Sequence, residues 1–149
     1  MDRYLLSSQV FVEFFKRSDP AVTDFLKKVG SKNAYISTLT VGIVRAAIDA
    51  APAAERRKFE RYFLDGLQAL KGCILPVDEG ATDQWAIIRP CTILRHQGGD
   101  TLGEDEKLII ATAMNQGMIF LGQRPVTDPP DQLENLGFMT RDPWLQPWP

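Results

Sequence analysis

The sequence predicts an α/β fold, a three-layer α/β/α sandwich around a mainly parallel central sheet. Short apolar runs typical of buried strands alternate with longer segments whose apolar residues recur every three or four positions. Strands that alternate with helices in this way form parallel sheets with helices on both faces. The length of 149 residues suits one domain, and we expect residues 1–149 to form it.

The first half of the chain carries most of the predicted helices. Val10, Phe11, Phe14 and Phe15 have helical spacing, and the alternating, β-branched segment 33–40 is typical of a strand. Pro20 suits a first helical turn. The predicted elements are a strand at 3–6, a helix around 10–15, a helix from Pro20 to Gly30, a strand at 33–40 that runs into a helix at 40–51, a helix at 52–72 and a strand at 73–78.

The second half continues the alternation. We expect a helix through 85–88, a loop at 96–105, a helix at 106–117, a strand at 118–122, a proline-broken loop at 123–132 and a last short strand within 137–144. Ligands bind parallel sheets at the carboxyl ends of the strands. The ends here are 7–9, 38–40, 77–79 and 122–124, so the candidate site belongs there.

Composition excludes several classes of protein. The net charge of −2 gives no overall basic field for nucleic acid, and no apolar run is long enough to span a membrane. Cys73 and Cys91 are too few for a disulfide framework, which predicts two buried thiols in a cytoplasmic protein. His96 is the sole histidine. It is interpreted as a loop or surface residue, without a triad or a histidine-rich metal site.

Polar residues near the strand ends allow more than one reading. Ser8 is interpreted as the cap of the helix that starts near Gln9; the alternative is a phosphate pocket formed by serine hydroxyls, Gln123 and Arg124. The basic cluster within 56–61 is read as a solvated helix face, with an RNA patch as the alternative. The tail that contains Trp144 and Trp148 packs back on the domain or docks a partner.

The order of these motifs resembles the PIN-domain family, in particular the VapC-like toxins of toxin–antitoxin and plasmid-stability modules. Residues 4–13, YLLSSQVFVE, stand where family members have a pattern like YLLDTNVLSEL. The other matching segments are ISTLTVGI at 36–43, EKLIIATA at 106–113, the strand end GQRPVTD at 122–128, and Pro143-Trp144. The resemblance covers nearly the whole chain and implies the same α/β/α fold.

The resemblance also implies a ribonuclease that holds Mg²⁺ or Mn²⁺ on carboxylates. The acidic positions of the family correspond here to Ser7, Ile43, Glu106 and the pair Gln123–Arg124. Only Glu106 offers a firmly placed carboxylate, and Mg²⁺ needs charged oxygen ligands in the right places. We therefore expect no cofactor and no catalytic residues. The cleft positions are then vestigial: Ser7, Gln9, Ile43, Glu106, Gln123 and Arg124.

Three functions follow as hypotheses. The first is a degenerate protein that acts as a binding or regulatory module, in which Ser8 and Arg124 could contact phosphate or RNA. The second is an active Mg²⁺- or Mn²⁺-dependent ribonuclease with the rearranged carboxylates Glu13, Glu106 and Asp128. The third is a decaying gene product.

The resemblance also implies partners for the chain. Family members are typically homodimers that bind an antitoxin, and we expect the same association here. RNA is a weaker expectation. In addition, we expect Ser7, Ile43, Glu106 and Gln123 or Arg124 to converge at one end of the sheet.

Overall fold

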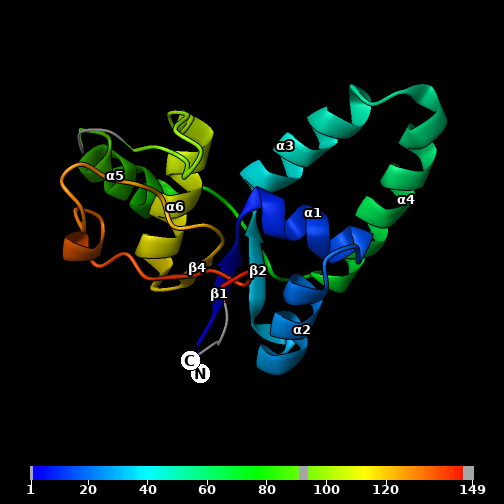
Figure 1. The fold of residues 1–149 in the computed structure, drawn as a ribbon, viewed down its shortest axis with the longest axis horizontal. Coiled ribbons are helices and arrows are strands. Elements are labelled where there is room, and N and C mark those ends of the chain that lie inside the picture. The colour runs from blue at the N-terminus through cyan, green and yellow to red at the C-terminus, as the bar shows by residue number, and fades with distance from the viewer. Residues whose placement is uncertain (1, 91–93, 146–149) are drawn as a thin grey trace.

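The computed structural model describes residues 2–90 and 94–145 and shows a central sheet between two groups of helices (Figure 1). Short strands lead directly into helices along most of the chain, as the alternating pattern predicted. The elements are β1 (Tyr4–Leu6), α1 (Ser8–Lys16), α2 (Pro20–Val29), β2 (Ala34–Ser37), α3 (Thr38–Asp49), α4 (Ala53–Ala69), β3 (Ile74–Leu75), α5 (Glu79–Ile88), α6 (Glu104–Gln116), β4 (Ile119–Leu121) and β5 (Thr140–Arg141), with 3₁₀ turns at Ser31–Asn33 and Glu134–Leu136.

The five strands form one parallel sheet in the order β3-β2-β1-β4-β5. β1 is central, and Tyr4 pairs with Ala34 on one side and with Ile119 on the other. All four neighbouring pairs are parallel, which confirms the predicted α/β class. Because β1 and β4 lie side by side, their carboxyl ends place Ser7 next to Gly122.

Alternate residues of the strands face two separate hydrophobic cores. Leu6 and Leu121 pack with residues of α1 to α4, whereas Leu5 and Phe120 pack with Ile88 of α5 and with α6. The sheet therefore has α1–α4 on one face and α5–α6 on the other. This arrangement confirms the three-layer sandwich, because side chains alternate between the two faces of a strand.

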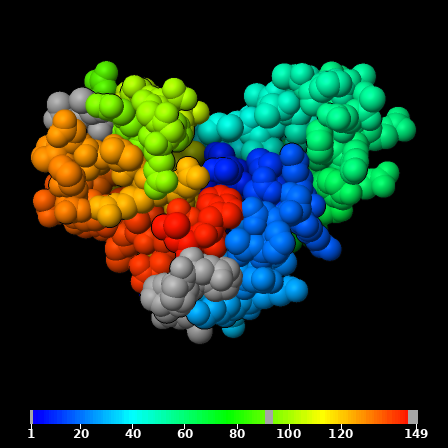
Figure 2. Space-filling view, viewed as in Figure 1, coloured from blue at the N-terminus to red at the C-terminus, as the bar shows by residue number. Residues whose placement is uncertain are grey.

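Helices α3 and α4 form an arm that projects from the sheet (Figure 1). Figure 2 shows a notch between this arm and the part of the molecule that contains α6, with the dark blue N-terminal region at its base. The arm is fixed to the body where α4 packs on α1, and Phe15 and Phe63 meet there edge to face at 5.9 Å between ring centroids. The notch leads to the carboxyl ends of the central strands.

Several predicted boundaries shift in the structure. Helix α6 begins at Glu104 rather than 106, because three acidic residues fit its first turn, where carboxylates interact well with the helix dipole. Helix α3 begins at Thr38, since the Ser37 hydroxyl accepts a hydrogen bond from the Leu39 amide at 3.1 Å. The strand predicted at 73–78 is only Ile74–Leu75.

The cysteine and tail predictions are resolved in part. Cys73 is half-buried rather than buried, and Cys91 lies outside the described residues. Trp144 packs against the first core, and its indole Nε1 donates to Asp19 Oδ2 at 2.6 Å. The tail therefore packs back on the domain as far as Trp144, whereas Trp148 is not described. In the described ranges, no helix has the length and apolar character needed to cross a membrane.

Candidate functional site

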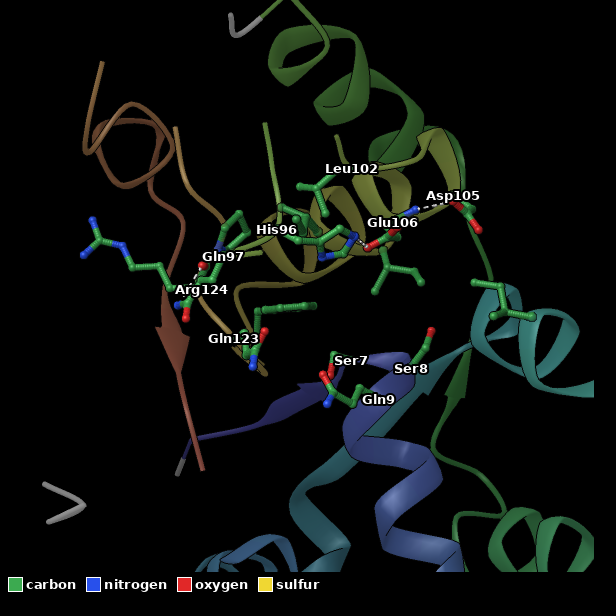
Figure 3. Close-up of a pocket in the computed structure, with 15 residues that line it drawn as sticks. Ser7, Ser8, Gln9, His96, Gln97, Leu102, Asp105, Glu106, Gln123 and Arg124 are labelled. Atoms are coloured by element: carbon green, nitrogen blue, oxygen red, sulfur yellow. Dashed lines mark hydrogen bonds and ion pairs between the residues drawn. The ribbon is translucent and has the colours of Figure 1, made fainter. Parts of the chain in front are cut away.

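A cavity of about 300 Å³ opens at the carboxyl ends of β1 and β4 (Figure 3). Its wall is mostly apolar, with polar side chains from four separate parts of the chain. The lining residues are Ser7, Ser8, Gln9, Ile43, His96, Gln97, Leu102, Asp105, Glu106, Ile109, Ile110, Phe120, Gln123, Arg124 and Pro125. The structure thus brings Ser7, Ile43, Glu106, Gln123 and Arg124 together at one end of the sheet, as the strand-end argument predicted.

Ser7 lies at the base of this cavity and caps helix α1. Its hydroxyl oxygen accepts from the Val10 amide at 3.1 Å, while its own amide donates to the Leu121 carbonyl at 2.9 Å. The interpretation of Ser8 as the cap is therefore wrong by one residue: β1 ends at Leu6, and Ser7 keeps the extended backbone of a cap. Ser8 occupies the first helical turn instead.

The polar side chains of Ser8, Gln9 and Gln123 line the cavity. In the described part of the chain, none of them forms a hydrogen bond to another protein group. They carry no charge, so they contribute donors and acceptors but nothing that would hold a divalent cation strongly. Ile43 contributes only an apolar surface to the cavity.

Glu106 is the candidate carboxylate, and it is already engaged by the protein. Its Oε2 lies 2.8 Å from His96 Nε2, and its Oε1 accepts from the Gly103 amide at 3.3 Å. Sequence reasoning placed His96 correctly on a loop but missed this contact. The sequence offered one signal for this contact, because the loop that contains His96 directly precedes the helix that contains Glu106. No rule of residue spacing predicts which side chain of such a loop contacts the helix.

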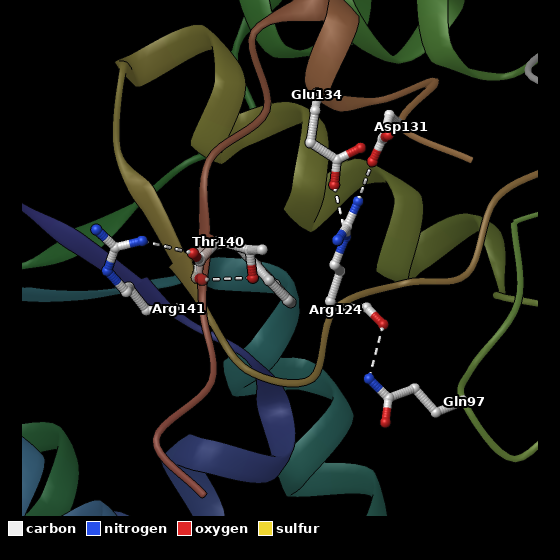
Figure 4. A network of polar contacts seen from close by, with 7 residues as sticks. Gln97, Arg124, Asp131, Glu134, Thr140 and Arg141 are labelled. Atoms are coloured by element: carbon white, nitrogen blue, oxygen red, sulfur yellow. Dashed lines mark hydrogen bonds and ion pairs between the residues drawn. The ribbon is translucent and has the colours of Figure 1, made fainter. Parts of the chain in front are cut away.

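In Figure 3 the Arg124 guanidinium points away from Ser7 and Glu106, and Figure 4 shows the two carboxylates that pair with it. Its guanidinium donates to Asp131 at 2.5 Å and to Glu134 at 2.8 Å. Hydrogen bonds to Asp131, and then to Glu134, raise the pKa of Arg124 above its ordinary value. Arg124 therefore lines the cavity, as its place at the strand end predicted, while its guanidinium is paired with two carboxylates of the following loop.

The alternative carboxylates do not join Glu106. Glu13 lies a turn farther along α1, where its Oε2 accepts from the Ser18 hydroxyl at 2.6 Å. Asp128 is exposed, and neither residue lines the cavity. Among residues 2–90 and 94–145, no group of three or more histidine, cysteine, aspartate or glutamate side chains could hold one metal ion. The residues present do not fit the Mg²⁺ or Mn²⁺ implied by the resemblance.

A comparison with known proteins decides the family. No family model matches the chain. The VapC ribonuclease Y4jK of Sinorhizobium fredii is 30% identical over 118 residues, which is 77% of this chain and 82% of that protein. The chain belongs to the VapC-like PIN-domain family. The relative is named as a ribonuclease, and Ser7 and Ile43 of this chain are the residues that the sequence resemblance sets at acidic positions.

Solved structures show the same fold at low sequence identity. FitAcB from Neisseria gonorrhoeae has a TM-score of 0.73 and 21% identity, covering 96% of this chain and 99% of that one. DNA-bound VapBC from Salmonella typhimurium has a TM-score of 0.70 and 14% identity, with the same coverage of 96% and 99%. The VapC-like architecture is therefore preserved over nearly the whole chain.

Proposed function

We propose that this VapC-like protein has no metal-dependent nuclease activity and acts as a binding or regulatory module. One observation carries the proposal: the acidic side chains that line the cavity, Asp105 and Glu106, are neighbours in α6, and the Glu106 carboxylate is engaged by His96. The strand-end and α3 positions of the cavity, Ser7, Gln123 and Ile43, are uncharged. Hydrolysis of a phosphodiester by the family route needs a cation that activates water and offsets charge on the phosphate. A cation gains too little at this site to offset its dehydration.

The proposed partner is an antitoxin-like protein. The VapBC-5 structure from Mycobacterium tuberculosis is described as a member of the VapBC family of toxin–antitoxin systems, and the FitAB structure and the VapBC structures from Rickettsia felis and Salmonella typhimurium are described as bound to DNA. By analogy with these structures, we propose that this protein binds a second, antitoxin-like protein chain. We also propose that it is a cytoplasmic protein and forms a homodimer. The proposal of an RNA contact has less support, because the Arg124 guanidinium is paired with Asp131 and Glu134. Ser8 is then the remaining candidate for a contact with phosphate or RNA.

Cleavage of a structured RNA tests the proposal directly. The unmodified protein and Glu106→Gln are incubated with the RNA and Mg²⁺ or Mn²⁺, with and without a chelator. We expect no metal-dependent cleavage by either protein. Cleavage that the chelator abolishes and Glu106→Gln removes would instead establish an active ribonuclease, the activity for which the 30% identical relative is named.

Restoration of the lost carboxylates provides a positive control for the site. Ser7→Asp alone should not create a Mn²⁺ site, because Ile43 still leaves a gap in the ligand set. Ser7→Asp together with Ile43→Glu should give Mn²⁺ binding measurable by calorimetry. Arg124→Asn as a third change should add little, because Asp131 and Glu134 already pair with the Arg124 guanidinium. Tight Mn²⁺ binding by the unmodified protein would contradict the role given to these positions.

A further inference from the structure

A hairpin of residues 94–102 covers one side of the cavity. Leu94 and Leu102 anchor its two ends in the second core, with the Leu102 amide donating to the Leu94 carbonyl at 2.9 Å. Between them the His96 amide donates to the Asp100 carbonyl at 2.7 Å. The 94–102 hairpin is thus closed by its own backbone, and its position presents the His96 side chain to Glu106 (Figure 3).

The same hairpin is also fastened to the segment that follows β4. Arg95 and Val126 exchange two backbone hydrogen bonds, at 3.0 and 2.9 Å. Gln97 Nε2 donates to the Arg124 carbonyl at 3.3 Å (Figure 4). Among the described residues, the contact between the His96 and Glu106 side chains is the polar side-chain link from this hairpin to helix α6. One side chain therefore joins the hairpin to the helix that carries the cleft carboxylate.

Both oxygens of Glu106 lie close to a protein nitrogen. His96 Nε2 lies 2.8 Å from Oε2, and the Gly103 amide lies 3.3 Å from Oε1. The two side chains are 43% and 36% exposed, so the contact is reachable from solvent. A cation that approached Oε2 from the cavity would have to displace the imidazole and leave the hairpin without this link.

We propose that His96 is a positioning residue that occupies, on Glu106, the place a cation takes in a carboxylate site. Glu106 then serves to hold the 94–102 hairpin closed over the cleft. This inference rests on the proposed function, because it accepts that the cleft works without a metal. It adds that His96 competes with any cation for the Glu106 carboxylate. The loss of carboxylates is then only one of two reasons why the cavity does not bind a metal ion.

Hydrogen exchange of the hairpin amides is the first test. His96→Ala should speed exchange by about tenfold or more at the backbone amides of residue 96, Leu102 and Val126. The reason is that the 94–102 hairpin opens more easily without the imidazole. His96→Gln keeps an N–H near the same place and should restore part of the protection. Glu104→Gln is the matched control: it removes a carboxylate of the same helical turn that contacts Trp85 and Lys107 instead. Unchanged hairpin protection in His96→Ala would overturn the proposal.

Competition with a cation is the second test. In the Ser7→Asp/Ile43→Glu background, adding His96→Ala should tighten Mn²⁺ binding by about tenfold, and adding Glu106→Gln as well should remove that gain. Equal Mn²⁺ affinity with and without His96 would show that the imidazole does not compete, which overturns the proposal. Where neither restored variant binds Mn²⁺, the hairpin exchange result decides.

The two proposals can fail separately. Chelator-sensitive RNA cleavage by the unmodified protein would refute the proposed function, whatever the hairpin amides do. Unchanged exchange in His96→Ala, together with no RNA cleavage, would leave the proposed function in place and remove only the role given to His96.

Discussion

Among single residues, the neighbouring serines Ser7 and Ser8 at the end of β1 have different roles. The Ser7 hydroxyl caps α1 through the Val10 amide, whereas Ser8 faces the cavity and forms no side-chain hydrogen bond within the described residues. An aspartate at position 7, which the family resemblance implies for relatives, could cap the same helix equally well. A serine therefore fills the capping role of this position without a charge.

Substitution of the two serines should separate these roles. Ser7→Ala should lower the free energy of unfolding by about 1 kcal/mol, the usual cost of losing a helix cap. Ser8→Ala should change it by less than about 0.5 kcal/mol, as for most exposed sites. Urea denaturation of both variants measures the difference. Equal effects would show that Ser7 does not act as the cap.

The candidate site was predictable in position but only partly in its contacts. Ser7, Ile43, Glu106 and Gln123 follow or face strand ends, and parallel strands bring such residues to one edge. The pairing of His96 with Glu106, and the outward turn of Arg124, depend on how two loops fold back. Loop conformations are set by long-range contacts, which leave no periodic signal in the sequence.

At the scale of elements, close packing of α4 on α1 depends on Gly66. A Cβ added there would lie 2.7 Å from the Phe15 Cβ, whereas one added at Gly42 in α3 would meet nothing within 4 Å. Both glycines are within helices. The α3–α4 arm therefore packs on the body at a position, Gly66, where only a hydrogen atom fits. Gly66 and Gly42 form a matched pair of helical glycines for substitution by alanine.

Alanine substitutions at Gly66 and Gly42 should change the free energy of unfolding in opposite directions. Gly66→Ala should destabilise the protein by about 1–3 kcal/mol, because the added methyl overpacks the contact with Phe15. Gly42→Ala should stabilise it by about 0.5–1 kcal/mol, because alanine favours the helix and nothing obstructs it. Thermal unfolding of the two variants provides the measurement. A stabilised Gly66→Ala would mean that α1 and α4 pack less closely than described.

The order of elements could be predicted from apolar periodicity, whereas their ends could not. The apolar stripe with Phe59, Phe63 and Leu67 predicted α4 well. The start of α6 was missed by two residues, because Glu104 and Asp105 are equally at home in a loop or in a first helical turn. The choice between these two states depends on Gly103 and on tertiary contacts such as that of Trp85 with Glu104.

For the whole molecule, the C-terminal segment is tied to α2. The Trp144 indole donates to Asp19 Oδ2 at 2.6 Å, while Asp19 Oδ1 caps the helix through the Ala21 amide at 2.9 Å. Trp144→Phe keeps the ring packing but removes this donor. It should lower the free energy of unfolding by about 1.5–3 kcal/mol, the usual range for a hydrogen bond to a charged group. Chemical denaturation that shows no change would mean that water replaces the indole without cost.

Association is the second prediction for the whole molecule. Leu64 on α4 and Ile87 on α5 are 51% and 53% exposed, which gives apolar surface for a contact between copies. We expect a homodimer with two-fold symmetry, the commonest arrangement of identical chains. Light scattering at micromolar concentrations measures the mass. A monomer throughout that range would contradict the proposed dimer.

The central place of β1 governs when the cleft can first exist during translation. Tyr4 and Leu6 pair with Ile119 and Leu121, more than a hundred positions later in the chain. A nascent chain can assemble β1, β2 and α1 to α4 early, but Leu5 then faces water until α6 and β4 emerge from the ribosome. Ser7 meets Gly122 only at that late moment. The cleft therefore cannot form until residues 119–122 have been synthesised, whereas the α3–α4 arm, which ends at Ala69, can form much sooner.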